Sequence, residues 1–325
     1  MLRRLRGYRG IAPVSRTGLV AGRLLQIVPT FLAIGVVVFV LARLLPGDPV
    51  SAMLGDRASD EAVTRLRQGL GLDEPIWTQF LIFAGNMVRG EFGTSIAFRL
   101  PVTAVIAERL PATLMLTGLA TLFALVFAIP LAFVAAVQAG RWLDHLIRAV
   151  FQVGLSSPIF YVGLVLLTVF AAGLRWFPVG GYGDGVAEHL HHLLLPALTL
   201  ALSFSAVIMR NLRAAILQVL QTEFVDFARS KGLPRRVILV QHVLRNAMLS
   251  TVTLVGLQVG ALLGGAVITE SVFAVPGVGR LMVDSIFARD YPVIQALTLV
   301  LAVIVSLAFL LTDLVQMWLD PRVAH

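Results

Sequence analysis

The sequence predicts an all-α protein that crosses a membrane six times. Of its 325 residues, 58% are hydrophobic and only 14% are charged, and the mean hydropathy is +0.89. This composition is typical of a polytopic membrane protein. A hydrocarbon core of about 30 Å is crossed by roughly 20 helical residues, and six apolar segments approach or exceed that length. Each should be helical, because backbone amides in lipid must be satisfied within their own segment.

The charges between these segments predict their orientation. Residues 1–23 contain six arginines and no acidic residue, which predicts a basic cytoplasmic N-terminal segment. The first apolar run has no small-residue cleavage site, so we expect a retained helix and not a secretory signal. The predicted spans are Leu24–Ala42, Leu110–Ala139, Ala149–Leu174, Leu193–Met209 (continuing past Arg210), Ala247–Thr269 and Val293–Thr312. Both termini are expected to be cytoplasmic, in a plasma or inner membrane.

The segment 43–109 is expected to lie outside, because its seven arginines are balanced by eight acidic residues. Residues 60–67 and 75–83 are predicted to form short helices, and residues 90–95 a turn. We expect a small external cap and not a separate domain. The core would comprise residues 110–320.

A long basic stretch between the fourth and fifth spans, residues 212–246, is the most informative feature of the chain. Hydrophobic residues recur in it at three- and four-residue steps, which predicts a helix. Thr222 is the expected N-cap, Gly232 the expected C-cap, and Pro234 turns the chain away. A second helix over Arg235–Arg245 should follow. The sequence therefore predicts helix, sharp turn and helix, which suits docking of a soluble partner or, alternatively, an interfacial helix on anionic lipid.

The fifth predicted span contains glycines at four-residue spacing: Gly256, Gly260 and Gly264. Small residues at this spacing let helices approach closely. The pattern favours internal packing, with a partner subunit or the transport pathway as the alternative. The external loop after this span is predicted to turn at Pro276-Gly277.

Several kinds of chemistry are excluded or disfavoured. The only lysine, Lys231, is followed by Gly-Leu-Pro, so no nucleotide-binding P-loop is present. His189, His191 and His192 could share a metal, but we expect them in a solvated loop. The net charge of +8 lies in loops that flank the membrane, which argues against nucleic acid as a partner. No catalytic, cofactor or metal residue is predicted.

Ionisable residues are also missing from the middle of the predicted spans. Glu270, Asp313, Arg210 and Arg175 lie near span ends, where snorkelling is expected. A proton- or sodium-coupled carrier normally has such a group at mid-depth. We therefore expect the chain to take its energy from a partner.

The chain resembles the permease subunits of binding-protein-dependent ATP-binding cassette importers, in particular the B-type permeases of oligopeptide and dipeptide systems. The stretch Asp226-Phe227-Ala228-x-x-x-Gly232 followed by His242-Val243-Leu244-Arg245-Asn246 is similar to that family's cytoplasmic EAA loop. Other matching stretches begin at Leu44, Leu70, Gly90, Arg109, Glu270 and Ala288. The resemblance runs from about residue 24 onward. Departures from the general motif are Asp226 for glutamate, Phe227 for alanine and Arg245 for proline.

The resemblance implies a type I importer permease that is not itself an enzyme. It would pair with a second homologous permease, two cytoplasmic ATPases that bind ATP and Mg²⁺, and an extracellular or periplasmic solute-binding protein that delivers peptide. The coupling residues would be Glu223, Phe224, Asp226, Phe227, Ala228, Arg229, Lys231, Gly232 and Leu233. The external-loop residues would be Glu270, Pro276, Gly277, Gly279 and Arg280. A nickel or other small-solute permease is one alternative, and a self-contained channel or intramembrane enzyme is another.

Overall fold

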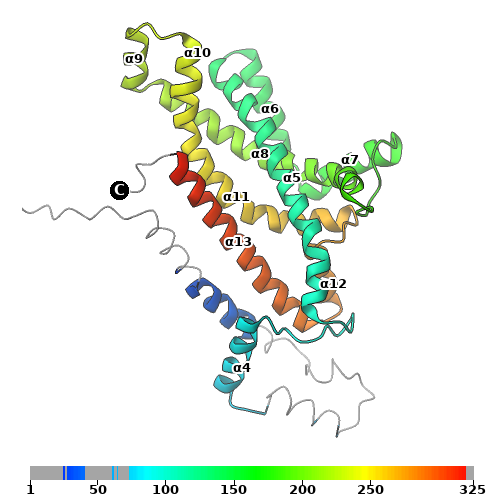
Figure 1. Ribbon diagram of the computed structural model, residues 1–325. Coiled ribbons are helices and arrows are strands. Elements are labelled where there is room, and N and C mark those ends of the chain that lie inside the picture. The colour runs from blue at the N-terminus through cyan, green and yellow to red at the C-terminus, as the bar shows by residue number, and fades with distance from the viewer. Residues whose placement is uncertain (1–24, 26–27, 41–60, 62–63, 65–72, 320–325) are drawn as a thin grey trace, which may run out of the picture.

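The computed structural model describes residues 25, 28–40, 61, 64 and 73–319 (Figure 1). Within these ranges the chain is helical apart from turns, loops and one isolated β-bridge between Thr94 and Pro101. Four helices are long and apolar enough to cross a membrane. They are α5 (Val102–Val137), α8 (Val186–Leu220), the continuous helix Arg235–Val272, and Tyr291–Met317 within α13 (Tyr291–Leu319). The predicted all-α membrane fold is confirmed.

The continuous helix contains α10 (Arg235–Val237), a π-helical segment η2 (Ile238–Leu244) and α11 (Arg245–Val272). The shorter helix α9 (Glu223–Ser230) precedes it, and α12 (Val278–Phe287) follows it. Figure 1 shows α9, α10 and the α5–α6 turn at one end of the bundle and α12 at the opposite end. The bundle therefore has two distinct ends.

The predicted third span is not one continuous helix. Its residues form α6 (Trp142–Ser156), α7 (Ile159–Leu166) and the π-helical η1 (Leu167–Gly173), with a bend of 105° between the two halves. Pro158 causes the break, since the residue before a proline is pushed out of the helical region. Ser157 is accordingly extended, with φ −85° and ψ 131°. The bent pair makes a fifth crossing only if both halves belong to one span.

The first predicted span lies partly outside the described residues. Its described part, Val28–Val40, is an apolar helix that contacts α4 (Ile76–Arg89). The Phe39 ring lies 5.2 Å from that of Phe80 and 5.6 Å from that of Phe83 between centroids. The predicted helix at residues 75–83 is thus present and longer than expected, whereas the one at 60–67 lies almost entirely outside the described ranges.

The helices α5 and α8 extend beyond the apolar stretches that predicted them. α5 begins after Pro101 and α8 after Gly185. Pro111 and Pro196, at the starts of the predicted apolar spans, therefore lie inside the helices. Hydropathy marks the part of a helix that lies in lipid, and it does not mark where the helix begins.

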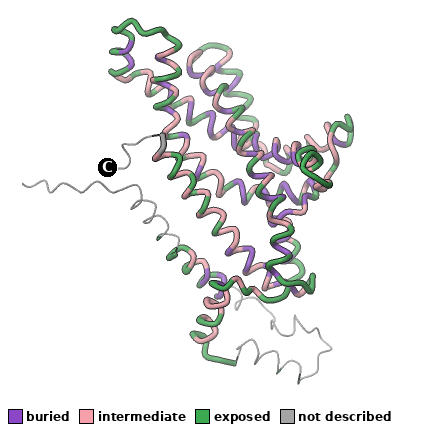
Figure 2. The backbone as a smooth tube through the Cα atoms, in the orientation of Figure 1, coloured by how far each residue is buried: buried purple, intermediate pink, exposed green. Residues whose placement is uncertain are grey.

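A ladder of small residues packs α5 against α8 in the core. Every fourth residue of α5 in this ladder is at most 3% exposed, and six of the seven are alanines. Small side chains at this spacing allow two helix backbones to approach closely. Figure 2 shows the buried residues concentrated where these helices cross. The ladder consists of Ala112, Leu116, Ala120, Ala124, Ala128, Ala132 and Ala136.

Candidate functional site: the α9 turn and the ends of the bundle

The predicted turn after α9 is present, and its hydrogen bonds form a Schellman motif. The Gly232 N–H donates to the Arg229 carbonyl (2.9 Å), and the Leu233 N–H donates to the Ala228 carbonyl (3.3 Å). Gly232 has φ +72°, a left-handed conformation in which a Cβ is strained. Pro234 then begins the next helix as its N-cap. The helix, sharp turn and helix predicted around Gly232 are confirmed.

One local prediction around this turn is wrong in detail. Thr222 occupies the N-cap position of α9, but its hydroxyl donates to the Val219 carbonyl (2.6 Å) and makes no cap hydrogen bond. The predicted helix Arg235–Arg245 is present and leads directly into the fifth span, as expected. Neither glycine nor proline occurs between residues 235 and 255, so nothing in the sequence ends the helix there.

The helix α9 is anchored on one face and exposed on the other. Val225 is fully buried and Ala228 is 6% exposed. Of its aromatic side chains, Phe224 is 43% and Phe227 is 61% exposed. Surface phenylalanines this exposed usually mark contact with a partner or with lipid.

The other predicted coupling residues are exposed as well: Glu223, Asp226, Arg229, Lys231, Gly232 and Leu233. Asp226 and Arg229 form an ion pair of 3.0 Å between two exposed side chains, which contributes little stability because water screens it. The Lys231 ammonium lies 4.5 Å from the Phe227 ring centroid. The exposed face of α9 therefore combines aromatic rings with charges of both signs.

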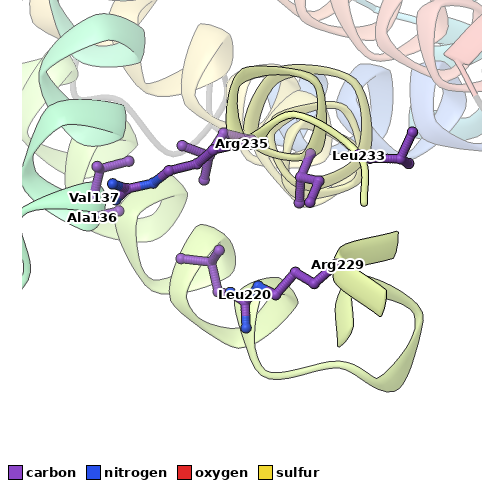
Figure 3. Close-up of a pocket in the computed structure, with 8 residues that line it drawn as sticks. Ala136, Val137, Leu220, Arg229, Leu233 and Arg235 are labelled. Carbon is purple, nitrogen blue, oxygen red and sulfur yellow. The ribbon is translucent and has the colours of Figure 1, made fainter. Parts of the chain in front are cut away.

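A cavity of about 380 Å³ lies between this turn and the ends of α5 and α8. Figure 3 shows Arg229 reaching from α9 towards Leu220, and Arg235 reaching towards Ala136 and Val137. The other lining side chains are those of Leu233, Ile238 and Leu239. The cavity walls therefore combine two guanidinium groups with apolar side chains.

The glycines of α11 have different surroundings. A Cβ on Gly256 would lie 2.7 Å from the Thr312 Cβ on α13, and a Cβ on Gly260 would lie 3.5 Å from a methyl group of Val305. These two glycines serve internal helix packing, which the glycine spacing favoured. Gly264 has nothing within 4 Å and is exposed.

At the opposite end of the bundle, Glu270 joins three helices. It is fully buried and accepts hydrogen bonds from the Thr113 hydroxyl of α5 (2.5 Å) and from the Arg280 N–H in the first turn of α12 (2.9 Å). The Thr113 hydroxyl also accepts from the Val278 N–H (2.9 Å). The expected snorkelling of Glu270 is therefore wrong, because closeness to a span end does not say which way a side chain points.

The glycines of the predicted external loop are explained by this carboxylate. A Cβ on Gly277 would collide with the Glu270 carboxylate, and a Cβ on Gly279 would lie 2.7 Å from the Val267 Cα. Gly277 begins α12 as its N-cap, next to the half-buried Pro276. The Arg280 side chain lies 3.8 Å from Asp284 on the surface. Of the predicted loop residues, Glu270 thus belongs to α11, whereas Gly279 and Arg280 lie in the first turn of α12.

A second buried carboxylate brings together two stretches that carried the resemblance. Asp290, just before α13, is fully buried. It accepts hydrogen bonds from the Ser95 hydroxyl and from the Ala97 N–H (3.1 Å). The two segments are 195 residues apart in the sequence. This contact fixes the turn before α5 to the α12–α13 turn.

Sequence reasoning missed a third buried carboxylate, Asp144, at the end of the bundle that carries α9. It lies in the first turn of α6 and is fully buried. Arg213 of α8 donates to both of its oxygens, at 2.8 and 2.7 Å. The partners are 69 residues apart, so no local pattern indicates the pair.

The three histidines are not in a solvated loop, because α8 already begins at Val186. His189 stacks on Tyr182 with ring centroids 3.8 Å apart. The His191 and His192 rings lie within hydrogen-bond distance of the Trp176 and Gly180 carbonyls, at 3.1 and 3.0 Å. In the described part of the chain, no group of three His, Cys, Asp or Glu residues could hold a metal ion.

Comparisons with known proteins agree with this architecture. Residues 128–325 match the family model described as binding-protein-dependent transport system inner membrane component, and residues 18–117 match the model of the N-terminal part of such components. The glutathione transport system permease protein GsiC of Escherichia coli (strain K12) is 39% identical over 303 residues, which cover 93% of this chain and 97% of that protein. The GsiC protein of Salmonella typhimurium has the same identity and coverage.

A solved structure has the same fold. The inward-facing MetNI methionine ABC transporter aligns with a TM-score of 0.57 and 16% identity, covering 67% of this chain and 97% of that one. The chain is 39% identical to GsiC over nearly its full length, and it belongs to the family of binding-protein-dependent transport system inner membrane components. It is a multi-pass permease subunit of an ABC importer that works with a solute-binding protein and ATPase subunits.

Proposed function

We propose that this permease forms half of the pathway for short peptides, dipeptides or oligopeptides, and that a second homologous permease forms the other half. In this proposal α9 docks on one of two cytoplasmic ATPases, which bind the ATP and Mg²⁺. The N- and C-termini and α9 then lie on the cytoplasmic side, in keeping with the arginines of residues 1–23.

The exposed face of α9 is the observation that carries the coupling role. Two aromatic rings, at Phe224 and Phe227, are exposed on a helix that is anchored by the buried Val225 and Ala228. Aromatic side chains of this kind are frequent anchors in protein interfaces. The cavity that contains Arg229 and Arg235 lies beside them, so an acidic residue is expected on the ATPase surface.

The pathway role is supported by an exposed face of α11 that includes polar side chains. Exposed residues recur along one face of this helix at three- and four-residue steps: Asn246, Ser250, Thr253, Leu257, Ala261, Gly264, Ile268 and Ser271. The corresponding exposed face of α5 is apolar from Leu114 to Pro130. The four polar side chains on the α11 face, those of Asn246, Ser250, Thr253 and Ser271, suit water and solute, whereas the wholly apolar face of α5 suits lipid.

Peptides are the favoured solutes because GsiC carries the name of a glutathione transport system, and glutathione is itself a tripeptide. The nickel alternative depended on the three histidines. His191 and His192 contact backbone carbonyls of the preceding loop, and His189 packs on Tyr182. The histidine cluster therefore no longer favours nickel over peptide.

Cysteine crosslinking tests the docking of α9 directly. The chain has no cysteine, so Phe227→Cys places a single thiol on the exposed face of α9. We expect this variant to crosslink to the ATPase in the assembled complex, and Phe287→Cys on α12, 84% exposed at the opposite end, not to do so. Crosslinking of the α12 variant alone would contradict the proposed orientation and coupling.

Uptake into proteoliposomes that contain the whole complex tests the solute. Radiolabelled glutathione, dialanine and Ni²⁺ are offered separately with ATP inside. We expect uptake of glutathione or dialanine and not of Ni²⁺. Uptake of Ni²⁺ alone would refute the peptide assignment and leave the permease assignment intact.

A further inference from the structure

We infer that Asp144 is a positioning residue. It holds the last two turns of α8, which lead to α9, in the orientation required for coupling. The inference builds on the proposed role of α9. It concerns a residue outside the coupling loop, at the start of α6. Asp144 would act through Arg213 and through the backbone of the α5–α6 turn, and it would contact neither solute nor ATPase.

The contacts of Asp144 join three elements. Arg213 of α8 donates from Nε to Oδ1 (2.8 Å) and from Nη2 to Oδ2 (2.7 Å). The Gly140 N–H of the α5–α6 turn donates to Oδ2 (3.0 Å). Arg148 of α6 adds an ion pair of 3.2 Å to Oδ1. One buried carboxylate thus ties α8 to the end of α5 and the start of α6.

We call the paired hydrogen bonds between Asp144 and Arg213 the clamp. The position of Arg213 on α8 connects this clamp with α9. α8 ends at Leu220, seven residues and about 10 Å beyond Arg213, and α9 begins at Glu223. The last two turns of α8 are therefore an arm between the clamp and α9. Figure 1 shows that the α5–α6 turn and α9 lie at the same end of the bundle.

The form of the contact suits positioning. A planar guanidinium that meets both oxygens of a carboxylate fixes an angle as well as a distance. It therefore limits rotation of α8 about its own axis, which a contact between apolar side chains does less well. With the arm fixed, a displacement of α9 moves α5, α6 and α8 together. Without the clamp, part of that displacement would be lost as rotation of the arm.

The test uses the whole complex in proteoliposomes and measures solute transported per ATP hydrolysed. The probe is whichever of glutathione, dialanine or Ni²⁺ the wild-type complex takes up. Asp144→Asn keeps the shape of the side chain and removes its charge. We expect the transport-to-hydrolysis ratio to fall about fivefold or more, in line with typical couplings between sites. A loss of folded complex would lower both rates together and leave the ratio unchanged.

Matched variants separate the clamp from general damage. Arg213→Lys keeps the charge but loses the two-point contact, and it should lower the ratio as well. It also carries the test if Asp144→Asn is not recovered in complexes. The double variant Asp144→Asn/Arg213→Lys should be no worse than the more affected single variant, because both remove the same contact. Asp284→Asn, in the exposed pair with Arg280, should leave the ratio unchanged.

Two results would overturn the inference. A wild-type ratio in both Asp144→Asn and Arg213→Lys would show that the clamp does not serve coupling, and so would additive losses in the double variant. The proposed function is tested separately, because the Phe227→Cys crosslink to the ATPase should form with or without Asp144→Asn. Absence of that crosslink in the otherwise wild-type chain would instead contradict the docking of α9.

Discussion

Replacing Glu270 by alanine should destabilise the permease strongly, because this α11 carboxylate accepts hydrogen bonds from both α5 and α12. The substitution removes the acceptor of the Thr113 hydroxyl and of the Arg280 N–H. Both donors are then left without that partner in a site where Glu270 itself is fully buried. A buried donor without a partner costs about 1–3 kcal/mol. The expected loss is therefore about 2–6 kcal/mol in the free energy of unfolding.

Glu270→Gln provides an intermediate step in the same site. The amide oxygen can still accept one of the two hydrogen bonds, whereas the amide NH₂ faces the second donor. The expected loss is about 1–3 kcal/mol, equivalent to one unsatisfied group. The two variants should therefore rank in stability as glutamate, glutamine and alanine.

Thermal unfolding of the purified complex in detergent measures this ranking. Glu108→Ala on the exposed side of α5 is the matched control, since surface substitutions usually change stability by less than about 0.5 kcal/mol. One kcal/mol corresponds to about 2 °C for a chain of this size. A melting temperature of Glu270→Ala within about 1 °C of the Glu108→Ala value would refute the three-helix junction.

Two further pairs of variants test helix packing. Ala124→Leu inserts three carbon atoms into the fully buried ladder and should lower the free energy of unfolding by about 1–3 kcal/mol. Val126, on the same helix, is 54% exposed, so Val126→Leu should leave the melting temperature nearly unchanged. Gly256→Leu should lower the melting temperature, because its side chain would meet Thr312. Gly264 has nothing within 4 Å, so Gly264→Leu should retain stability. It should lower solute uptake, because Gly264 lies on the face of α11 proposed for the pathway. Equal melting temperatures within either pair would contradict the packing described.

Much of the fold could be predicted from hydropathy, because lipid admits few alternatives to helices. The turn at Gly232 could be predicted as well, since its glycine and proline act locally on the backbone. The break at Pro158 was harder, because an apolar run with one proline suits either a kinked span or two separate helices. The bend of 105° depends on how α6 and α7 pack.

The contacts that pin the helix ends could not be predicted in the same way. Asp290 and Ser95 both lie in stretches that resemble the family, but their pairing across 195 residues leaves no local pattern. Asp144 lies beside a basic segment and looks like any surface acid at a helix start. Its burial becomes visible only when Arg213, 69 residues further on, is placed against it.

The buried carboxylates occupy a consistent place in this bundle. Asp144 lies at the end with α9, and Glu270 and Asp290 lie at the end with α12. Between them, α5 packs on α8 largely through alanines, which make close but non-directional contacts. Hydrogen-bonded carboxylates resist rotation of the segments that they join, whereas alanine surfaces resist sliding much less. We therefore expect the turns to stay rigid at both ends while helix packing in the middle changes, which the proposed transmission of movement from α9 to the pathway would require.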